Sequence, residues 1–105
     1  MKYDIALIQK AVHEAIQAGM EFASVDDGGT CNFDACYLRV PGMRESAVAK
    51  IGGVSLMTSG WHGRTLHLSG THGQGNRRTT MAEAQLKFLV ANYPQLEAGM
   101  YYQMD

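Results

Sequence analysis

The sequence predicts an α+β fold in which helices pack against one antiparallel sheet. Three observations predict this class: an apolar stripe at helical spacing opens the chain, short stretches alternate between apolar and polar residues, and glycine-rich turns separate these segments. The chain has 105 residues, of which 46% are hydrophobic and 18% are charged, as in one domain with its own core. We therefore expect residues 1–105 to form a single globular domain.

The clearest predicted element is an amphipathic N-terminal helix over residues 4–22. Its apolar residues recur at steps of three and four and therefore share one face, which comprises Ile5, Ile8, Val12, Ile16 and Met20. The following segment 24–30 (SVDDGGT) has the Asp and Gly content of a turn. The helix should therefore end before a loop that leads into the sheet.

Alternation predicts the first strand, over residues 31–40, which Pro41-Gly42 ends. Its two faces are predicted to carry Cys36, Leu38 and Val40 on one side and Phe33, Tyr37 and Arg39 on the other. Cys31 and Cys36 are five residues apart and would point to opposite faces of a strand. We therefore expect two free, buried thiols and no disulfide between them.

A short helix over residues 43–51 and a β-hairpin are predicted next. The hairpin strands cover residues 54–59 and 64–70. A three-residue loop, Trp61-His62-Gly63, with Gly63 in the left-handed conformation, aligns the apolar side chains of both strands on one face, namely Val54, Leu56, Leu66 and Leu68. A two-residue loop would place these pairs on opposite faces, so we expect the longer loop.

The last predicted elements are a helix over residues 80–93 and a C-terminal strand over residues 100–104. Thr80 and Glu83 have the spacing of a capping box, which predicts that the helix begins at Thr80. Its inward face is predicted to carry Ala82, Leu86, Leu89, Val90 and Tyr93. The aromatic residues of the tail favour a strand over a frayed terminus.

After the first helix, the predicted elements follow the order β-α-β-β-α-β. This order resembles the split βαβ arrangement of ferredoxin-like domains, in which the first and third strands are central and both crossover helices lie on one face of the sheet. Without the short second helix and the last strand, the order would be α-β-β-β-α, as in double-stranded-RNA-binding domains. We expect the ferredoxin-like order, with the N-terminal helix covering the open face.

The charge pattern favours an anionic partner for the second half of the chain. Nine Lys and Arg residues nearly balance ten Asp and Glu residues, for a net charge of −1, which excludes a general nucleic-acid coat protein. No acidic residue lies between Glu45 and Glu83, whereas that stretch contains the basic residues Lys50, Arg64, Arg77 and Arg78. Any anion-binding face should therefore come from this stretch.

The candidate anion-binding site is the glycine-rich segment 71–78 (THGQGNRR) at the predicted helix start. Glycines let backbone N–H groups approach an anion, a helix N-terminus carries partial positive charge, and paired arginines bind phosphate or carboxylate. Its residues are Gly73, Gly75, Asn76, Arg77, Arg78 and Thr80. The segment matches neither the Walker A motif nor a dinucleotide-binding fingerprint. The alternative is a solvated loop whose donors are satisfied by Thr80 and Glu83.

A second candidate site is the sheet face that the crossover helices leave open. The candidate stacking residues on it are Phe33, Tyr37, Arg39 and His67. Aromatic rings beside a basic residue stack nucleobases, a layout that RNA-recognition domains use, although their glycine- and aromatic-rich motifs are absent from this sequence. Cover by the first helix, which we expect, or a homodimer would bury this face instead.

The sequence predicts no catalytic or metal site. His62, His67 and His72 are five residues apart, which does not align them on a strand face, and no Cys-x-x-Cys or His-x-x-x-His unit occurs. We therefore favour a protein without metal, cofactor or catalytic residues over an enzyme. Because no signal peptide or stretch of membrane-spanning length is visible, we expect a cytoplasmic protein.

Three function classes follow from these observations. The favoured class is a small non-catalytic binding module that contacts a phosphate-bearing partner, such as nucleic acid, through the glycine-rich segment and the arginine pair. The alternatives are a protein–protein adaptor that dimerises through its sheet or first helix, and an enzyme that acts on a small anionic substrate.

Overall fold

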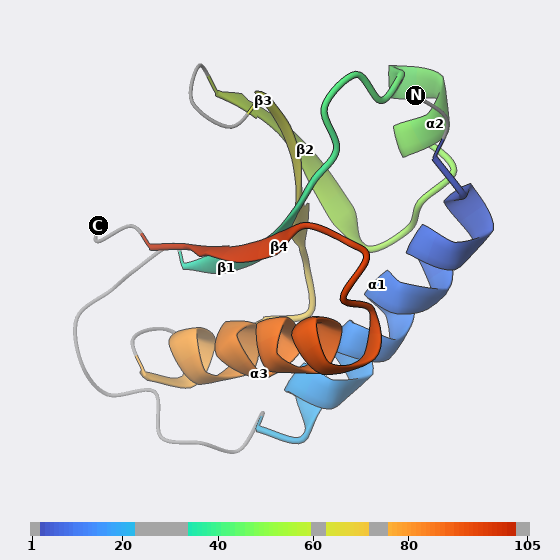
Figure 1. The fold of residues 1–105 in the computed structure, drawn as a ribbon. Coiled ribbons are helices and arrows are strands. Elements are labelled where there is room, and N and C mark those ends of the chain that lie inside the picture. The colour runs from blue at the N-terminus through green and yellow to red at the C-terminus, as the bar shows by residue number, and fades with distance from the viewer. Residues whose placement is uncertain (1–2, 23–33, 60–62, 72–75, 103–105) are drawn as a thin grey trace.

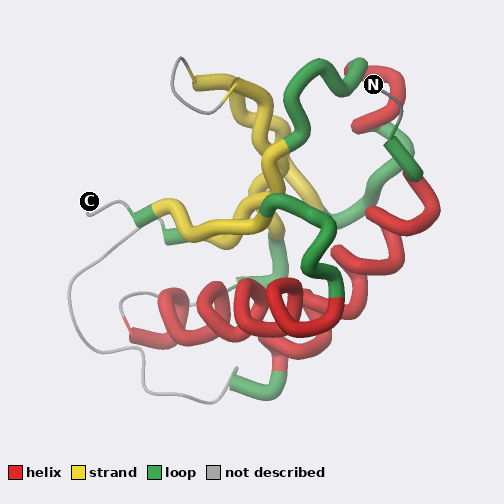
Figure 2. The backbone as a smooth tube through the Cα atoms, viewed as in Figure 1, coloured by secondary structure: helices red, strands yellow, loops and turns green. Residues whose placement is uncertain are grey.

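The protein has a small α+β fold, seen in a computed structural model that describes residues 3–22, 34–59, 63–71 and 76–102 (Figure 1). Its elements follow the order α1 (Ile5–Met20), β1 (Ala35–Arg39), α2 (Glu45–Val48), β2 (Val54–Ser59), β3 (Gly63–Leu68), α3 (Asn76–Asn92) and β4 (Ala98–Tyr101). The strands form one antiparallel sheet in the order β2-β3-β1-β4 (Figure 2). None of the described helices has the length and apolar character to span a membrane.

Helix α1 forms where the apolar stripe predicts it. The carboxylate of Asp4 accepts a hydrogen bond from the backbone N–H of Leu7 at 3.0 Å, which satisfies one of the free donors of the first turn. Ile8 and Val12 are almost completely buried, as the stripe predicts. Both side chains belong to the hydrophobic core that also includes Leu38 of β1.

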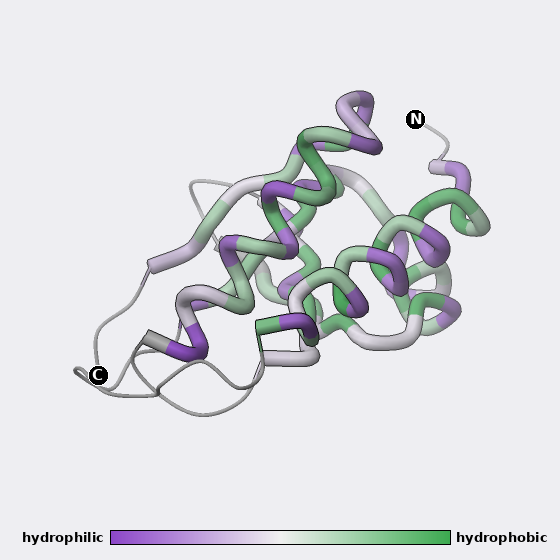
Figure 3. The backbone as a smooth tube through the Cα atoms, turned by 90° about the horizontal axis from the view of Figure 1, so that it is seen from below, coloured by the Kyte–Doolittle hydropathy of each residue, from purple (hydrophilic) through white to green (hydrophobic). Residues whose placement is uncertain are grey.

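The last turn of α1 packs against α3 through a glycine. A Cβ atom at Gly19 would lie 3.0 Å from both the Met81 carbonyl oxygen and the Gln85 side chain of α3, so the helices approach closely here. Figure 3 shows the two helices side by side, with polar and apolar residues alternating along each. Because Gly19 occupies the contact, Met20 is 42% exposed, and the prediction that Met20 belongs to the buried stripe is wrong.

Both long helices lie on the same side of the sheet, so α1 does not cover the opposite face, contrary to our expectation (Figure 1). The physical reason is that α2 has only four residues, which leaves the inner face of the sheet to be covered by α1 and α3. Ile16 of α1 lies over Gly53 and Gly70, where an added Cβ would come within 2.8 and 2.6 Å of its side chain. The glycines at the ends of β2 and β3 therefore make room for α1.

The hairpin of β2 and β3 has its apolar residues on one face, as the sequence predicts. Val54 pairs with Leu68 and Leu56 pairs with Leu66. Gly63 has a φ of +68°, the left-handed conformation assigned to it. Gly63 pairs with Ser59, however, so the connecting segment is residues 60–62, one position earlier than predicted.

Helix α3 begins at Asn76, four residues before the predicted start, so the capping-box prediction for Thr80 is wrong. Glu83 instead accepts a hydrogen bond from the hydroxyl of Tyr102 at 2.7 Å. Ala82, Leu89 and Tyr93 are buried as predicted, but Val90 is 59% exposed. The buried face of α3 also includes Met81 and Gln85, a spacing of four residues that turns Val90 toward solvent.

The C-terminal strand is present but starts earlier than predicted. Strand β4 covers Ala98–Tyr101 and pairs with β1, with Cys36 opposite Met100 and Tyr37 opposite Gly99. Strands β1 and β3 are therefore the two central strands of the sheet. Residues 103–105, at the end of the predicted strand, lie outside the described part of the chain.

Candidate functional site

The sheet face opposite the two long helices carries polar and aromatic residues of the central strands. Tyr37 of β1 lies opposite His67 of β3, and Arg39 lies opposite Thr65. Because side chains alternate along a strand, these residues point away from the core that contains Leu38 and its neighbours. No helix of the described chain lies over this face, which we call the outer face (Figures 1 and 2).

Three rings on the outer face form a continuous row. Tyr37 stacks with His67, with ring centroids 6.3 Å apart and an interplanar angle of 28°. His67 also contacts Tyr101 of β4, with centroids 5.3 Å apart and an angle of 46°. Tyr101 is 39% exposed, so the row has a solvent-accessible edge. The ring row offers planar apolar surface of the kind on which a planar ligand stacks.

A glycine in β4 gives Tyr37 its position in the ring row. A Cβ atom at Gly99 would lie only 2.6 Å from the Tyr37 hydroxyl oxygen and 2.7 Å from the adjoining ring carbon. The Tyr37 ring therefore lies across the strand next to its own, directly over Gly99, its partner in the sheet. No other residue type leaves space for the ring in this place.

A pocket of about 520 Å³ opens at one end of the ring row. His67 and Tyr101 contribute rings to its lining, and Met57 of β2, which is 49% exposed, contributes an apolar side chain. Arg78 lines the same pocket from the first turn of α3. The pocket, which we call the outer-face pocket, therefore joins residues from both sites that the sequence suggested separately.

Arg78 is held toward the outer-face pocket by a hydrogen bond. Its Nε donates to the backbone carbonyl of Asp34 at 3.0 Å, just before β1 begins. This bond uses one edge of the guanidinium group, and the described residues provide no hydrogen-bond partner for the two Nη amino groups. Arg78 can therefore donate bidentate hydrogen bonds to a bound anion without losing its anchor.

The first turn of α3 also holds a carboxylate of this chain. Asp34 is buried, and its Oδ2 accepts a hydrogen bond from the Thr79 hydroxyl at 2.8 Å. A carboxylate next to the first turn of a helix is stabilised by the helix dipole. Because Asp34 already occupies this position, a bound anion would have to contact Arg78 from the pocket side.

The residues of the predicted anion-binding site are only partly brought together. Arg78 lines the outer-face pocket, whereas Thr80 lines a different groove between α1 and α3. Asn76 and Arg77 belong to the first turn of α3, rather than to a loop before it. Gly73 and Gly75 lie outside the described residues.

The candidate stacking residues are brought together more completely. Tyr37, Arg39 and His67 share the outer face, and Phe33 lies outside the described residues. Sequence analysis missed Tyr101 and Met57 as members of this surface. Alternation along β2 could have placed Met57 on the outer face, because its neighbour Leu56 points to the core. The contact of Tyr101 with His67 depends on the pairing of β4 with β1, and the sequence around Tyr101 gives no sign of that pairing.

Burial shifts the pKa values of His67 and Cys36 and so decides their chemical state. Burial lowers the pKa of His67 below its usual value, which favours the neutral ring at neutral pH. Cys36 is a free thiol with no exposed surface, and burial raises its pKa to about 12. Cys36 is therefore a core residue rather than a nucleophile. Within the described ranges, no three His, Cys, Asp or Glu residues are grouped so that they could hold a metal ion.

Comparison with known proteins assigns no family to this chain. It matches no protein-family model, and searches against curated proteins and solved structures gave no match. The functional conclusion therefore depends on the geometry of the outer face.

Proposed function

We propose that the protein is a small non-catalytic module that binds single-stranded nucleic acid on its outer face. The observation that carries this proposal is the row of Tyr37, His67 and Tyr101, which leads into a pocket lined by Arg78. Single-strand-binding proteins combine aromatic stacking platforms with cationic groups that follow the backbone. Bases would stack on the ring row, and a phosphate would contact Arg78.

The position of these residues in the sheet supports the same proposal. We infer that the fold is a ferredoxin-like variant in which α1 and α3 take the places of the two crossover helices on one side of the sheet. Tyr37 and His67 then lie on the central strands β1 and β3, in the middle of the uncovered face. This arrangement supports access for several nucleotides in a row.

The charge distribution predicts modest affinity and a shallow dependence on salt. Arg78 supplies one phosphate contact, and Arg39 on the outer face is partly engaged by Glu97 at 3.2 Å. Each phosphate contact on a single strand contributes about −0.7 to the slope of log affinity against log salt concentration. We therefore expect a slope of about −1, with stacking supplying most of the binding free energy.

Fluorescence anisotropy with short labelled oligonucleotides tests the proposal. Wild-type protein should bind single-stranded RNA or DNA saturably at low salt and should bind the matching duplex more weakly. Tyr101→Ala should reduce affinity by about fivefold or more, since one stacked base contributes roughly 1–3 kcal/mol. Tyr102→Ala is the matched control, because Tyr102 is exposed next to Tyr101 in sequence but bonds to Glu83 instead of joining the ring row.

Two results would overturn the proposal. One is the lack of saturable binding to any single strand, and the other is equal affinity of the Tyr101→Ala and Tyr102→Ala variants. A concentration-dependent dimer in sedimentation experiments, lost on Met57→Ser, would instead show that the exposed residues of the outer face form an adaptor interface.

A further inference from the structure

Strand β2 forms one edge of the sheet and lacks the features that protect edge strands from pairing with another chain. Its six residues, VSLMTS, include no charged residue and no proline. It pairs with β3 in one continuous register from Val54 to Ser59, so no bulge interrupts it. Natural proteins use charges, prolines and bulges to block such edges. The free side of β2 is therefore a regular template for a further strand.

The hydrogen bonds between β2 and β3 show which backbone groups face the free side. The Ser69 N–H donates to the Gly53 carbonyl at 2.8 Å, so these two residues form a hydrogen-bonded pair of the ladder. In an antiparallel ladder such pairs recur at every second residue, which turns the odd-numbered residues of β2 toward β3. The N–H and C=O groups that point to the free side belong to Val54, Leu56 and Thr58, and no residue of the described chain bonds to them.

The inner side of β2 is covered only in part. Val54 and Leu56 pack against the hydrophobic core but remain partly exposed. Helix α2, which precedes the strand, has only four residues and cannot extend the helix layer past this edge. A partner that extends the sheet beside β2 would bury these apolar side chains further.

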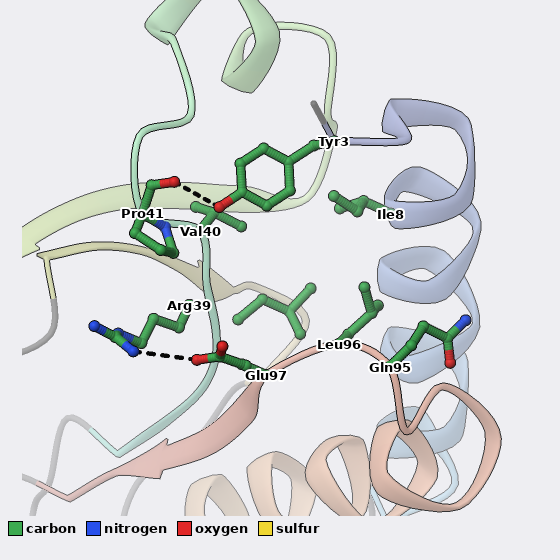
Figure 4. A pocket seen from close by; sticks show the side chains of 9 residues that line it. Tyr3, Ile8, Arg39, Val40, Pro41, Gln95, Leu96 and Glu97 are labelled. Carbon is green, nitrogen blue, oxygen red and sulfur yellow. Dashed lines mark hydrogen bonds and ion pairs between the residues drawn. The ribbon is translucent and has the colours of Figure 1, made fainter. Parts of the chain in front are cut away.

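The opposite edge of the sheet, β4, offers less to a partner strand. The Arg39 N–H donates to the Glu97 carbonyl at 2.8 Å, so within β4 only Ala98 and Met100 direct their backbone groups outward. The Glu97 carboxylate, next to the start of β4, forms an ion pair with Arg39 at 3.2 Å (Figure 4). Charges beside an edge strand oppose pairing with another chain. Of the two edges, β2 is therefore the one suited to pairing.

We propose that β2 pairs in antiparallel orientation with β2 of a second copy of this chain, about a two-fold axis through Leu56. In this register Leu56 lies opposite Leu56 of the second copy, and Val54 lies opposite Thr58. Each of these pairs exchanges two hydrogen bonds, so every outward N–H and C=O of the strand has a partner. A register shifted by two residues would leave one of the three residues in each copy unpaired.

A second copy fits this edge better than an isolated peptide does. The two-fold axis is perpendicular to the sheet, so the inner faces of both copies lie on the same side and each has its own helix layer. The Leu56 side chains then cover each other, whereas a peptide would leave its own inward side chains in water. Because β2 carries no charge, two copies also meet without like-charge repulsion.

The dimer joins the two outer-face pockets, a consequence that rests on the proposed function. Ser55 and Met57 line this pocket at the β2 edge. In the proposed register Ser55 lies opposite Met57 of the second copy, so each pocket borders a side chain of its partner. The two ring rows then belong to one continuous surface, which a longer single strand would contact twice.

Sedimentation equilibrium without nucleic acid tests the pairing. One added strand pair is smaller than a standard interface of about 1,600 Å², so we expect a dissociation constant on the order of 10–100 μM. Thr58→Pro removes an outward N–H but no bond to β3, and it should raise the dissociation constant about tenfold or more. Ala98→Pro is the matched control, because it removes an outward N–H from β4 and should leave the dimer unchanged. Circular dichroism checks that both variants keep the fold.

Disulfide cross-linking tests the register. Ser55 and Met57 of the second copy would form a non-hydrogen-bonded pair with Cα atoms about 4.5 Å apart, which a disulfide can bridge. A mixture of the Ser55→Cys and Met57→Cys variants, both carrying Cys31→Ser, should therefore form a link between positions 55 and 57 under mild oxidation. Either variant alone should form far less, because its new thiol lies opposite Met57 or Ser55. The buried Cys36 should not compete.

Three results would overturn this proposal. They are a monomer at all concentrations up to about 1 mM, equal dissociation constants of the Thr58→Pro and Ala98→Pro variants, and a mixture that forms no link between positions 55 and 57. All three are measured without nucleic acid, so they leave the binding function of the outer face to its own test.

Discussion

Replacement of Gly99 by alanine should displace the Tyr37 ring and thereby weaken binding on the outer face. The added Cβ would lie 2.6 Å from the Tyr37 hydroxyl oxygen, whereas ordinary contacts begin at 3.4 Å. The ring must therefore move by about 0.8 Å, the difference between these two distances. The contacting atoms are at the end of a side chain, so Tyr37 can swing away without a shift of the backbone.

The cost of this displacement follows from two terms. An off-rotamer side chain costs of order 0.5–1.5 kcal/mol, and loss of the stack with His67 forfeits an aromatic pair of about the same magnitude. The alanine also raises the free energy of unfolding by about 0.4–1 kcal/mol, because it restricts the unfolded chain more than glycine does. The net loss of unfolding free energy should be about 1 kcal/mol. The loss of binding should be larger, roughly 1–3 kcal/mol, since one stacking platform is removed.

Gly52→Ala is the matched control for this measurement. An added Cβ at Gly52 would meet only the Gln9 side-chain amide oxygen, at 4.0 Å. Gly52→Ala therefore restricts the unfolded chain in the same way as Gly99→Ala but introduces no clash in the folded protein. Urea unfolding followed by circular dichroism gives the stability of both variants, and oligonucleotide anisotropy gives their affinity. Equal stability and equal affinity of the Gly99→Ala and Gly52→Ala variants would refute the placement of the Tyr37 ring over β4.

Three further predictions concern the core, the helix contact and pH. The Cys36 thiol should be unreactive toward a disulfide reagent in the native protein and react only after unfolding, because its burial raises its pKa to about 12; prompt native labelling, assigned to Cys36 by peptide mapping, would contradict this. Gly19→Ala should lower the urea unfolding free energy by about 1–3 kcal/mol, because its Cβ would lie 3.0 Å from Met81 and Gln85 of α3; a gain in stability, as helix propensity alone predicts, would show that the helices separate at no cost. Burial lowers the pKa of His67 in the folded protein below its unfolded value of 6.5, so the unfolded state takes up a proton first as the pH falls, and the stability that is present above pH 6.5 should decrease below it. Urea midpoints at pH values on either side of 6.5 should therefore differ more for wild type than for His67→Gln, and an equal difference in both proteins would count against this assignment.

Local periodicity was sufficient to predict several elements of the fold. The alternation along β1 predicted the buried side of Cys36 and Leu38, and the number of residues between Leu56 and Leu66 predicted the shared face of the hairpin. These features could be predicted because each follows from the geometry of one strand or one turn. The apolar stripe that predicted α1 was wrong only in placing Met20 on the buried face. At this turn of α1 the residue in contact with α3 is Gly19.

The start of α3 shows how a distant residue overrides a local signal. Thr80 and Glu83 have the spacing of a capping box, but Asp34 bonds to Thr79 and accepts from Arg78 through its carbonyl oxygen. These contacts hold the preceding turn of the helix, and Glu83 bonds to Tyr102 instead. Asp34, more than forty positions away in sequence, thus helps to hold the first turn of the helix. The sequence around Thr80 alone could not predict this contact.

The sequence by itself determined the helical and strand periods, the inward faces of β1 and the hairpin, and the stretch that lacks acidic residues. Tertiary structure decided which surfaces meet. Because α2 has only four residues, α1 covers part of the inner face of the sheet. The pairing of β4 with β1 places Tyr101 next to His67. The anchoring of Arg78 on Asp34 then placed a cation at the end of the ring row. These decisions depend on contacts between residues far apart in the chain, whose free energies are set by packing and closure of the whole fold rather than by any local pattern.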